Sequence, residues 1–238
     1  MEYKRLLICA SELQKERVDD FQTAETMRCI SHANEARGLH KEGTRQLKEA
    51  LDIYKQLNLT IVQAKCWQQL GRPLYRDGQL DAAEETASRA IDLFSDTDQQ
   101  AAVCECYRTL GDICQSKGVP AKAIGHLETA LGIATRSNWL PPMQFWIHCS
   151  LAQLPFEENK FDDAHAHIER AKSHAINDRY RFGRAMKMQA WSWYRQRMFE
   201  EAKSEALGAP KVYGEVGPSK DVEDCKVILR DIEEATSR

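Results

Sequence analysis

Small residues recur at a fixed spacing along this chain, and this spacing limits its fold more than any other feature. In five successive frames a Gly or Ala is followed twelve residues later by Ala, and in four of them another Ala follows after seven more residues. The frames open at Gly38, Gly71, Gly111, Ala152 and Ala190, which gives steps of 33, 40, 41 and 38 residues. Periods of about 20 to 50 residues are typical of proteins that stack one structural unit repeatedly.

The residue types in each frame predict a pair of antiparallel helices. A Gly or Ala on the first helix lets the Ala on the second helix approach closely, as ridges-into-grooves packing requires. Large residues such as Trp67 and Leu70 fill the space around that contact. Gly78, Gly118 and Asn159 are expected to end first helices, because these residue types suit the left-handed position after a helix. The pattern therefore predicts an all-α protein.

The motif Trp67-x-x-Leu70-Gly71, followed by Ala83 and Ala90, resembles the tetratricopeptide repeat. This resemblance implies a right-handed α-solenoid of antiparallel helix pairs, with about five repeats and terminal capping helices. The usual period of this repeat is 34 residues. The longer steps here resemble the elongated variant of about 40 residues found in kinesin-light-chain-like arrays. Residues 49–57 and 82–93 also resemble fungal arrays associated with STAND and NACHT switch domains.

The predicted organisation is a single solenoid over residues 1–238. It consists of an N-terminal helix, five repeats and a C-terminal capping helix, over residues 1–18, 19–58, 59–96, 97–138, 139–177, 178–215 and 219–236. The capping helix is expected to turn an apolar stripe toward the array, formed by Val222, Cys225, Ile228, Leu229 and Ile232. Its charged face is expected to meet water.

Two prolines interrupt predicted first helices. Pro73 and Pro155 each lack a backbone donor and crowd the carbonyl four residues earlier. We expect kinks near Gln69 and Leu151, or an early end to the helix that contains Pro155.

Composition argues against several classes of function. The chain has 33 Lys and Arg against 36 Asp and Glu, and nucleic-acid binders normally carry a basic excess. We therefore expect no nucleic-acid partner. No segment approaches the roughly 20 apolar residues of a membrane-spanning helix. The eight cysteines form no C-x-x-C pair, so they indicate core thiols in a reducing, cytoplasmic compartment rather than a metal site.

The sequence predicts no catalytic residues and no cofactor. Phosphate loops, nucleophile elbows and zinc-protease motifs are missing from the sequence. His165, His167 and His174 do not have the i, i+4 spacing of metal-binding pairs, so we interpret them as solvated residues on a helix surface.

The resemblance places a partner-binding groove on the first helices, on the face turned away from the second helices. The first repeat contributes His32, Glu35 and Leu39. The residues carried over from the later repeats are Lys65, Gln68, Arg72 and Tyr75, then Glu105, Arg108, Asp112 and Gln115, then Trp146, Cys149, Gln153 and Phe156, then Arg184, Lys187, Trp191 and Tyr194.

Four groove aromatics fall in adjacent repeats, and aromatic residues beside Arg are typical interface anchors. Trp146, Phe156, Trp191 and Tyr194 therefore form a candidate binding patch. The alternative is that Trp191 and Trp193 pack against the C-terminal helix, and that Trp146 packs against the connection at residues 139–142.

These observations favour a non-catalytic scaffold that binds a protein or peptide in the concave groove, as the sensor or scaffold part of a larger signalling protein. The alternative is a peptide or small-ligand receptor whose superhelical pitch changes on binding. Gln68, Arg72, Thr109 and Asp112 stand where chaperone-binding tetratricopeptide domains carry Lys and Asn, which argues against a chaperone clamp. The oligomeric state stays open.

Overall fold

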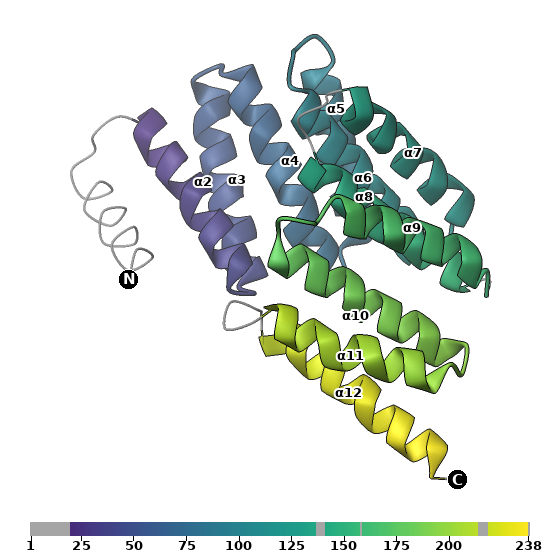
Figure 1. The fold of residues 1–238 in the computed structure, drawn as a ribbon. Coiled ribbons are helices and arrows are strands. Elements are labelled where there is room, and N and C mark those ends of the chain that lie inside the picture. Colours follow the sequence, from purple (N-terminus) through teal and green to yellow (C-terminus); the bar gives the residue numbers. More distant parts are fainter. Residues whose placement is uncertain (1–19, 137–140, 158, 214–218, 238) are drawn as a thin grey trace. The chain divides into compact units, whose positions relative to one another are not determined.

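The computed structural model describes residues 20–136, 141–157, 159–213 and 219–237 (Figure 1). Over these ranges the chain forms eleven α-helices and no strand, which confirms the all-α prediction. The helix predicted over residues 1–18 lies outside the described residues.

The helices come in consecutive pairs, and one pair lies within each of the five ranges predicted for repeats. Their bounds are α2 Asp20–Ala36, α3 His40–Gln56, α4 Thr60–Arg76, α5 Leu80–Phe94, α6 Gln100–Ser116, α7 Pro120–Arg136, α8 Pro141–Glu157, α9 Phe161–Ser173, α10 Arg179–Arg195, α11 Phe199–Tyr213 and α12 Ser219–Thr236.

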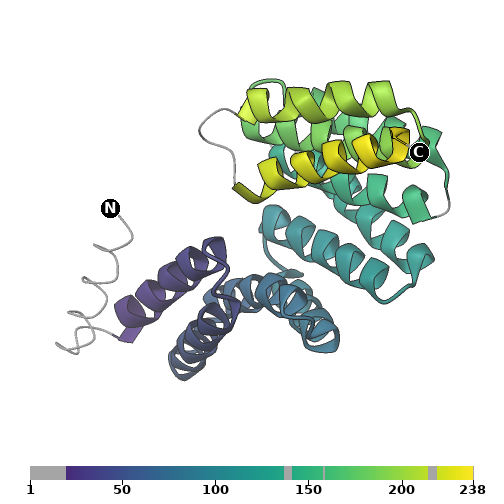
Figure 2. The ribbon, with the colours of Figure 1, turned by 90° about the horizontal axis from the view of Figure 1, so that it is seen from below.

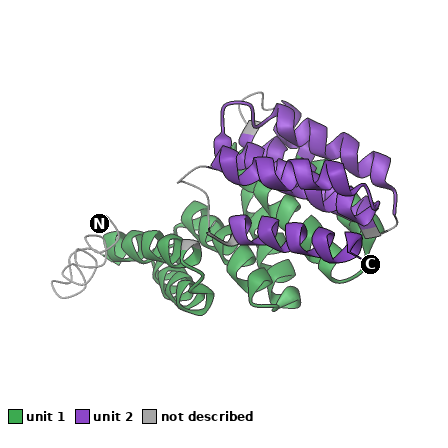
Figure 3. Cartoon of the chain, turned by 60° about the horizontal axis from the view of Figure 1, so that its bottom comes forward, with its two compact units in different colours: residues 1–130 green, residues 131–238 purple. Residues whose placement is uncertain are grey.

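The chain divides into two compact units (Figure 3). Unit 1 covers residues 1–130 and unit 2 covers residues 131–238, with the boundary inside α7. In unit 1, α4 packs against α5 and α6, and α2 packs against α3. In unit 2, α8 packs against α9, and α10, α11 and α12 lie side by side, as Figures 1 and 2 both show.

The turn inside each of the five pairs contains a residue with positive φ, and in the fifth pair this residue is Arg197, with φ of 61°. Gly78 and Gly118 have φ of 78° and 72°, and Asn159 has φ of 56°, as predicted for residues that follow a first helix. Gly38 occupies the same place after α2, with φ of 76°. The first frame was therefore wrong, because it took this turn glycine for a helix-contact residue.

The true contact pair of the first repeat lies seven residues earlier. Ser31 stands 40 residues before Gly71, and Gly43 stands 40 before Ala83. Ser31 Oγ donates a hydrogen bond of 2.8 Å to the Gly43 carbonyl, and a Cβ added at Gly43 would lie 3.2 Å from the Ser31 carbonyl oxygen. The first pair thus makes the same kind of close helix contact as the later pairs, with Ser in place of Gly on the first helix.

The small residues of the other frames lie in the core. Every second-helix Ala of those frames is at most 1% exposed, namely Ala83, Ala90, Ala123, Ala130, Ala164, Ala171, Ala202 and Ala209. On α12, Cys225, Ile228 and Ile232 are also buried, which confirms the predicted orientation of its apolar stripe.

The cysteines follow the core pattern with one exception. Six of the seven cysteines in the described ranges are buried thiols, whereas Cys29 on α2 is exposed. Burial raises the pKa of Cys66 and of Cys106 to about 12, so both thiols stay protonated near neutral pH. These six behave as small apolar residues.

Neither proline ends its helix early. Pro73 lies inside α4, which continues to Arg76, and Pro155 lies inside α8, which continues to Glu157. The early end considered for the helix of Pro155 is therefore wrong. Both prolines lie in the last turn of their helices, so only two or three helical residues follow each of them.

The close approach at Gly111 can be tested by a matched pair of substitutions. A Cβ at Gly111 would lie 2.5 Å from Leu127 Cγ, whereas a Cβ at Gly125 on α7 would meet nothing within 4 Å. We expect Gly111→Ala to lower the free energy of unfolding by about 1–3 kcal/mol through overpacking. Gly125→Ala should raise it by up to about 1 kcal/mol, since Ala is the better helix former. Urea denaturation measures both, and equal effects at the two positions would contradict the packing argument.

Candidate functional site

In unit 1, the predicted groove residues of α2, α4 and α6 form a network of ion pairs. Glu35 Oε1 lies 3.8 Å from Arg72 Nε and 3.5 Å from Arg76 Nη1. Arg72 Nη1 in turn lies 3.5 Å from Glu105 Oε1, and Glu105 pairs with Arg108 at 2.5 Å. The first helices of three repeats are thus linked by charge along one face.

The centre of this network is buried. Arg108 is only 5% exposed, and its Nη1 also lies 2.9 Å from Asp112 Oδ2. Burial alone would raise the pKa of the Glu105 carboxyl, yet the adjacent Arg108 and Arg72 hold this pKa below its usual value. Because these charges satisfy one another, they hold helices together and offer little free charge to a partner.

The other predicted groove residues of unit 1 are placed less uniformly. Tyr75 Oη lies 3.1 Å from Ser116 Oγ, which adds a contact between α4 and α6. Leu39 lies in the turn after α2 and is 45% exposed, a consequence of the misplaced first frame. His32 is exposed on α2, and the half-buried remainder comprises Lys65 and Gln68 on α4 and Gln115 on α6.

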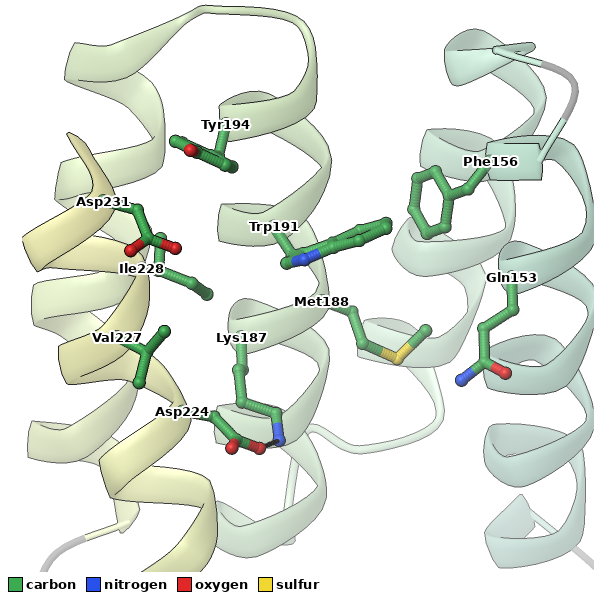
Figure 4. A pocket seen from close by; sticks show the side chains of 10 residues that line it. All are labelled: Gln153, Phe156, Lys187, Met188, Trp191, Tyr194, Asp224, Val227, Ile228 and Asp231. Carbon is green, nitrogen blue, oxygen red and sulfur yellow. Dashed lines mark hydrogen bonds and ion pairs between the residues drawn. The ribbon is translucent and has the colours of Figure 1, made fainter. Parts of the chain in front are cut away.

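In unit 2, the first helices α8 and α10 enclose a cleft together with α12 (Figure 4). Its volume is about 430 Å³, within the range of roughly 300–1,000 Å³ typical of ligand sites. The lining residues are Gln153 and Phe156 from α8, Lys187, Met188, Trp191 and Tyr194 from α10, and Asp224, Val227, Ile228 and Asp231 from α12.

Aromatic side chains form the middle of this cleft. The Trp191 and Phe156 rings meet edge to face with centroids 5.4 Å apart. Trp191 is 40% exposed, whereas Phe156 is only 4% exposed. Phe156 therefore packs against the Trp191 indole and is not itself an exposed anchor. Figure 4 shows Trp191 between Phe156 on one side and Tyr194 on the other.

A cluster of charges joins α10 to α12 at the edge of the cleft. Lys187 Nζ donates to Asp221 Oδ1 and, at 2.7 Å, to Asp224 Oδ2. Arg184 Nη1 lies 3.7 Å from the same Asp221 carboxylate, which is 6% exposed as a residue. These contacts hold α12 in the position where its side chains form one wall of the cleft.

Not every predicted residue of unit 2 joins the cleft. Trp146 is half-buried and lies outside the lining; the Arg184 guanidinium lies 5.1 Å from its ring centroid. Cys149 is buried at 5% exposure. The contact proposed between Trp146 and residues 139–142 falls largely outside the described residues. Trp193 packs near Ala190 and Ile228, with its ring 4.0 Å from that of His165.

The groove prediction missed one wall of the cleft. Asp224, Val227, Ile228 and Asp231 belong to α12, which was expected only to cap the array. The signal for them was present, because α12 follows α10 and α11 in the same alternation and therefore stands where a sixth first helix would stand. Met188 was missed because the frame placed it beside the groove positions.

His165 and His167 on α9 and His174 directly after it make contacts within the protein, so the interpretation of all three as solvated was wrong. His165 Nε2 lies 2.6 Å from Ser192 Oγ on α10. His167 and His174 flank the buried His148 of α8, with 3.2 Å between the Nδ1 atoms of His148 and His167 and parallel rings 5.7 Å apart for His148 and His174. No group of His, Cys, Asp and Glu suited to a metal ion occurs among the residues that the structure describes.

Comparisons with known proteins show the fold and no closer relationship. No protein-family model matches the sequence, and no curated protein matches it significantly. Within the described ranges, no helix is long and apolar enough to cross a membrane.

Three solved structures illustrate the fold. The apo form of the quorum sensor NprR from B. thuringiensis has a TM-score of 0.79 at 12% identity, covering 95% of this chain and 64% of that chain. The Rap conjugation gene regulator of plasmid pLS20, in complex with the Phr* peptide, gives 0.67 at 16% identity over 98% and 70%. A putative Podospora anserina kinesin light chain with TPR-like repeats gives 0.62 at 12% identity over 82% and 97%. The chain thus has the fold of tetratricopeptide-like helical solenoids.

The histidine contacts predict a loss of stability in weak acid. The pKa of His148 is lowered from 6.5 to about 4. Burial is the main cause, and the neighbouring His167 and His174 add to it. The unfolded chain therefore binds more protons than the folded one as the pH falls from about 6.5 to 4, and the folded state loses stability over that window. By pH 5 this single group should cost about 2 kcal/mol relative to pH 7.5. Urea unfolding at both pH values should show a smaller pH-dependent loss for His148→Gln, and identical losses would contradict the assignment.

Proposed function

We propose that this protein is a non-catalytic scaffold that binds an extended segment of a protein or peptide partner in the cleft of unit 2. The observation that carries the proposal is the half-exposed Trp191 indole, supported by buried Phe156 within a cleft of about 430 Å³. A large, rigid aromatic side chain that is held in place but still accessible is the usual anchor of a binding site.

The surroundings of Trp191 favour an extended segment over a flat protein surface. The cleft lies between α8, α10 and α12 and has apolar side chains at its centre, including Met188, Val227 and Ile228. Val227 is 37% exposed, so this apolar wall is open to solvent. A concave apolar strip of this kind accepts side chains from one strand of peptide.

The comparisons support a peptide rather than another class of ligand. One protein of the same fold, the Rap regulator of plasmid pLS20, is described in complex with a peptide. Fold likeness at 16% identity supports the class of ligand only by analogy. The analogy and the cleft chemistry point in the same direction.

We propose binding rather than turnover as the activity of the cleft. Its Lys187 is neutralised by two carboxylates, and those contacts hold α12 in place. In this position the Lys187 amine links two helices. The charges of unit 1 are likewise paired with one another.

We also propose a wider setting, which rests on the sequence resemblance. The scaffold would be the sensor part of a larger cytoplasmic signalling protein of the fungal STAND type. A phosphate-loop domain encoded in the same reading frame would support this setting, and a free-standing gene would contradict it.

Peptide capture tests the binding proposal. We would incubate the immobilised chain with a random hexapeptide library, identify enriched peptides by mass spectrometry, and measure the affinity of the best one by fluorescence anisotropy. Trp191→Ala should weaken binding at least tenfold, as loss of a central aromatic anchor does. Leu207→Ala is the matched control, because Leu207 is 46% exposed on α11 and lies outside the cleft. Absence of any enriched peptide, or equal binding by the two variants, would overturn the proposal.

A further inference from the structure

The cleft of unit 2 contains three charged side chains, and they differ in whether they have a partner. Lys187 and Asp224 are joined to each other at 2.7 Å, and Lys187 also holds Asp221. Asp231 lies one helical turn beyond Ile228 on the same wall. Within the described ranges its carboxylate has neither an ion pair nor a hydrogen bond, so its charge is available to a ligand.

The position of this carboxylate relative to the aromatic rings is specific. Figure 4 shows Asp231 on the side of Trp191 opposite Phe156, which is also the side of Tyr194. A cation in this part of the cleft would meet a carboxylate and aromatic side chains together. Carboxylates form charge-assisted hydrogen bonds with cations, and aromatic faces attract them through the ring quadrupole.

One cation of the protein already lies near the Trp191 ring. The Arg195 guanidinium lies 4.9 Å from the Trp191 ring centroid. Arg195 does not line this cleft; it lines a neighbouring cavity with Tyr194, Arg197, Phe199 and Ala235. Its stacking shows that the Trp191 ring already accepts a guanidinium group, while Asp231 stays unpaired.

We propose that the cleft of unit 2 recognises a basic side chain, Lys or Arg, flanked by an apolar residue in the bound peptide. Asp231 pairs with the positive charge beside Tyr194 and Trp191, and the apolar neighbour lies on Met188 and Val227. This inference rests on the proposed function, since it names the chemistry of the segment that the same cleft binds.

The alternation of apolar and charged lining explains why one basic residue is expected rather than a run of them. Only Asp231 offers an unpaired negative charge among the lining residues, because Asp224 is already held by Lys187. A second positive charge would therefore meet the Lys187 ammonium or the apolar centre of the cleft, and both would oppose it.

The residue preferences of captured peptides test this inference. With the hexapeptide library and the full chain, wild-type protein should enrich peptides that contain one Lys or Arg next to an apolar residue. Asp231→Asn should lose the preference for Lys and Arg and bind the best basic peptide about tenfold more weakly, the effect of losing one charge-assisted hydrogen bond. Asp231→Lys should shift the preference to Asp and Glu.

Glu234→Gln is the matched control, because it removes the same charge from α12 at an exposed position outside the cleft. It should leave the preference unchanged, and thermal unfolding should show both amide variants as stable as the wild type. Enriched peptides without basic residues, or a basic preference that survives Asp231→Asn, would overturn this inference and leave peptide binding intact. Failure of the wild type to enrich any peptide would overturn both.

Discussion

The close approach of paired helices at small residues is the contact on which the rest of the structure depends. Gly111 leaves no room for a side chain because Leu127 fills the space beside it, and Ser31 bonds directly to the Gly43 carbonyl. Such contacts set how near each second helix lies to its first helix. Within each unit, the opposite faces of the first helices then lie next to one another, and the candidate site is built on such faces in unit 2.

The two units use these faces differently. In unit 1, the positions carry charges that satisfy one another, with Arg108 buried between Glu105 and Asp112. In unit 2, the corresponding positions of α8 and α10 carry Phe156 and Trp191 and leave a cleft. The same repeat geometry thus supports an ion-paired face in one unit and an apolar, aromatic face in the other. Buried, paired charges leave little charge for a partner, whereas an exposed indole offers a partner an apolar contact.

The last helix does more than cover the array. Its buried stripe of Cys225, Ile228 and Ile232 packs as a cap should, yet its next face forms a wall of the cleft. The Lys187 contacts with Asp221 and Asp224 fix that wall against α10. Covering the array and lining the cleft are therefore properties of one helix, and Ile228 takes part in both.

The amino-acid sequence by itself determined the helix pairs, their approximate bounds and the faces that pack together. These features depend on residues close in the chain, where helical periodicity and turn chemistry act locally; the error at Gly38 arose because glycine serves both helix contacts and turns. Only the tertiary structure decided that Phe156 is buried against Trp191 and that His148 contacts His167 and His174. Those residue pairs lie 19 to 35 positions apart in the chain, and side-chain packing between their helices leaves no periodic signal in the sequence.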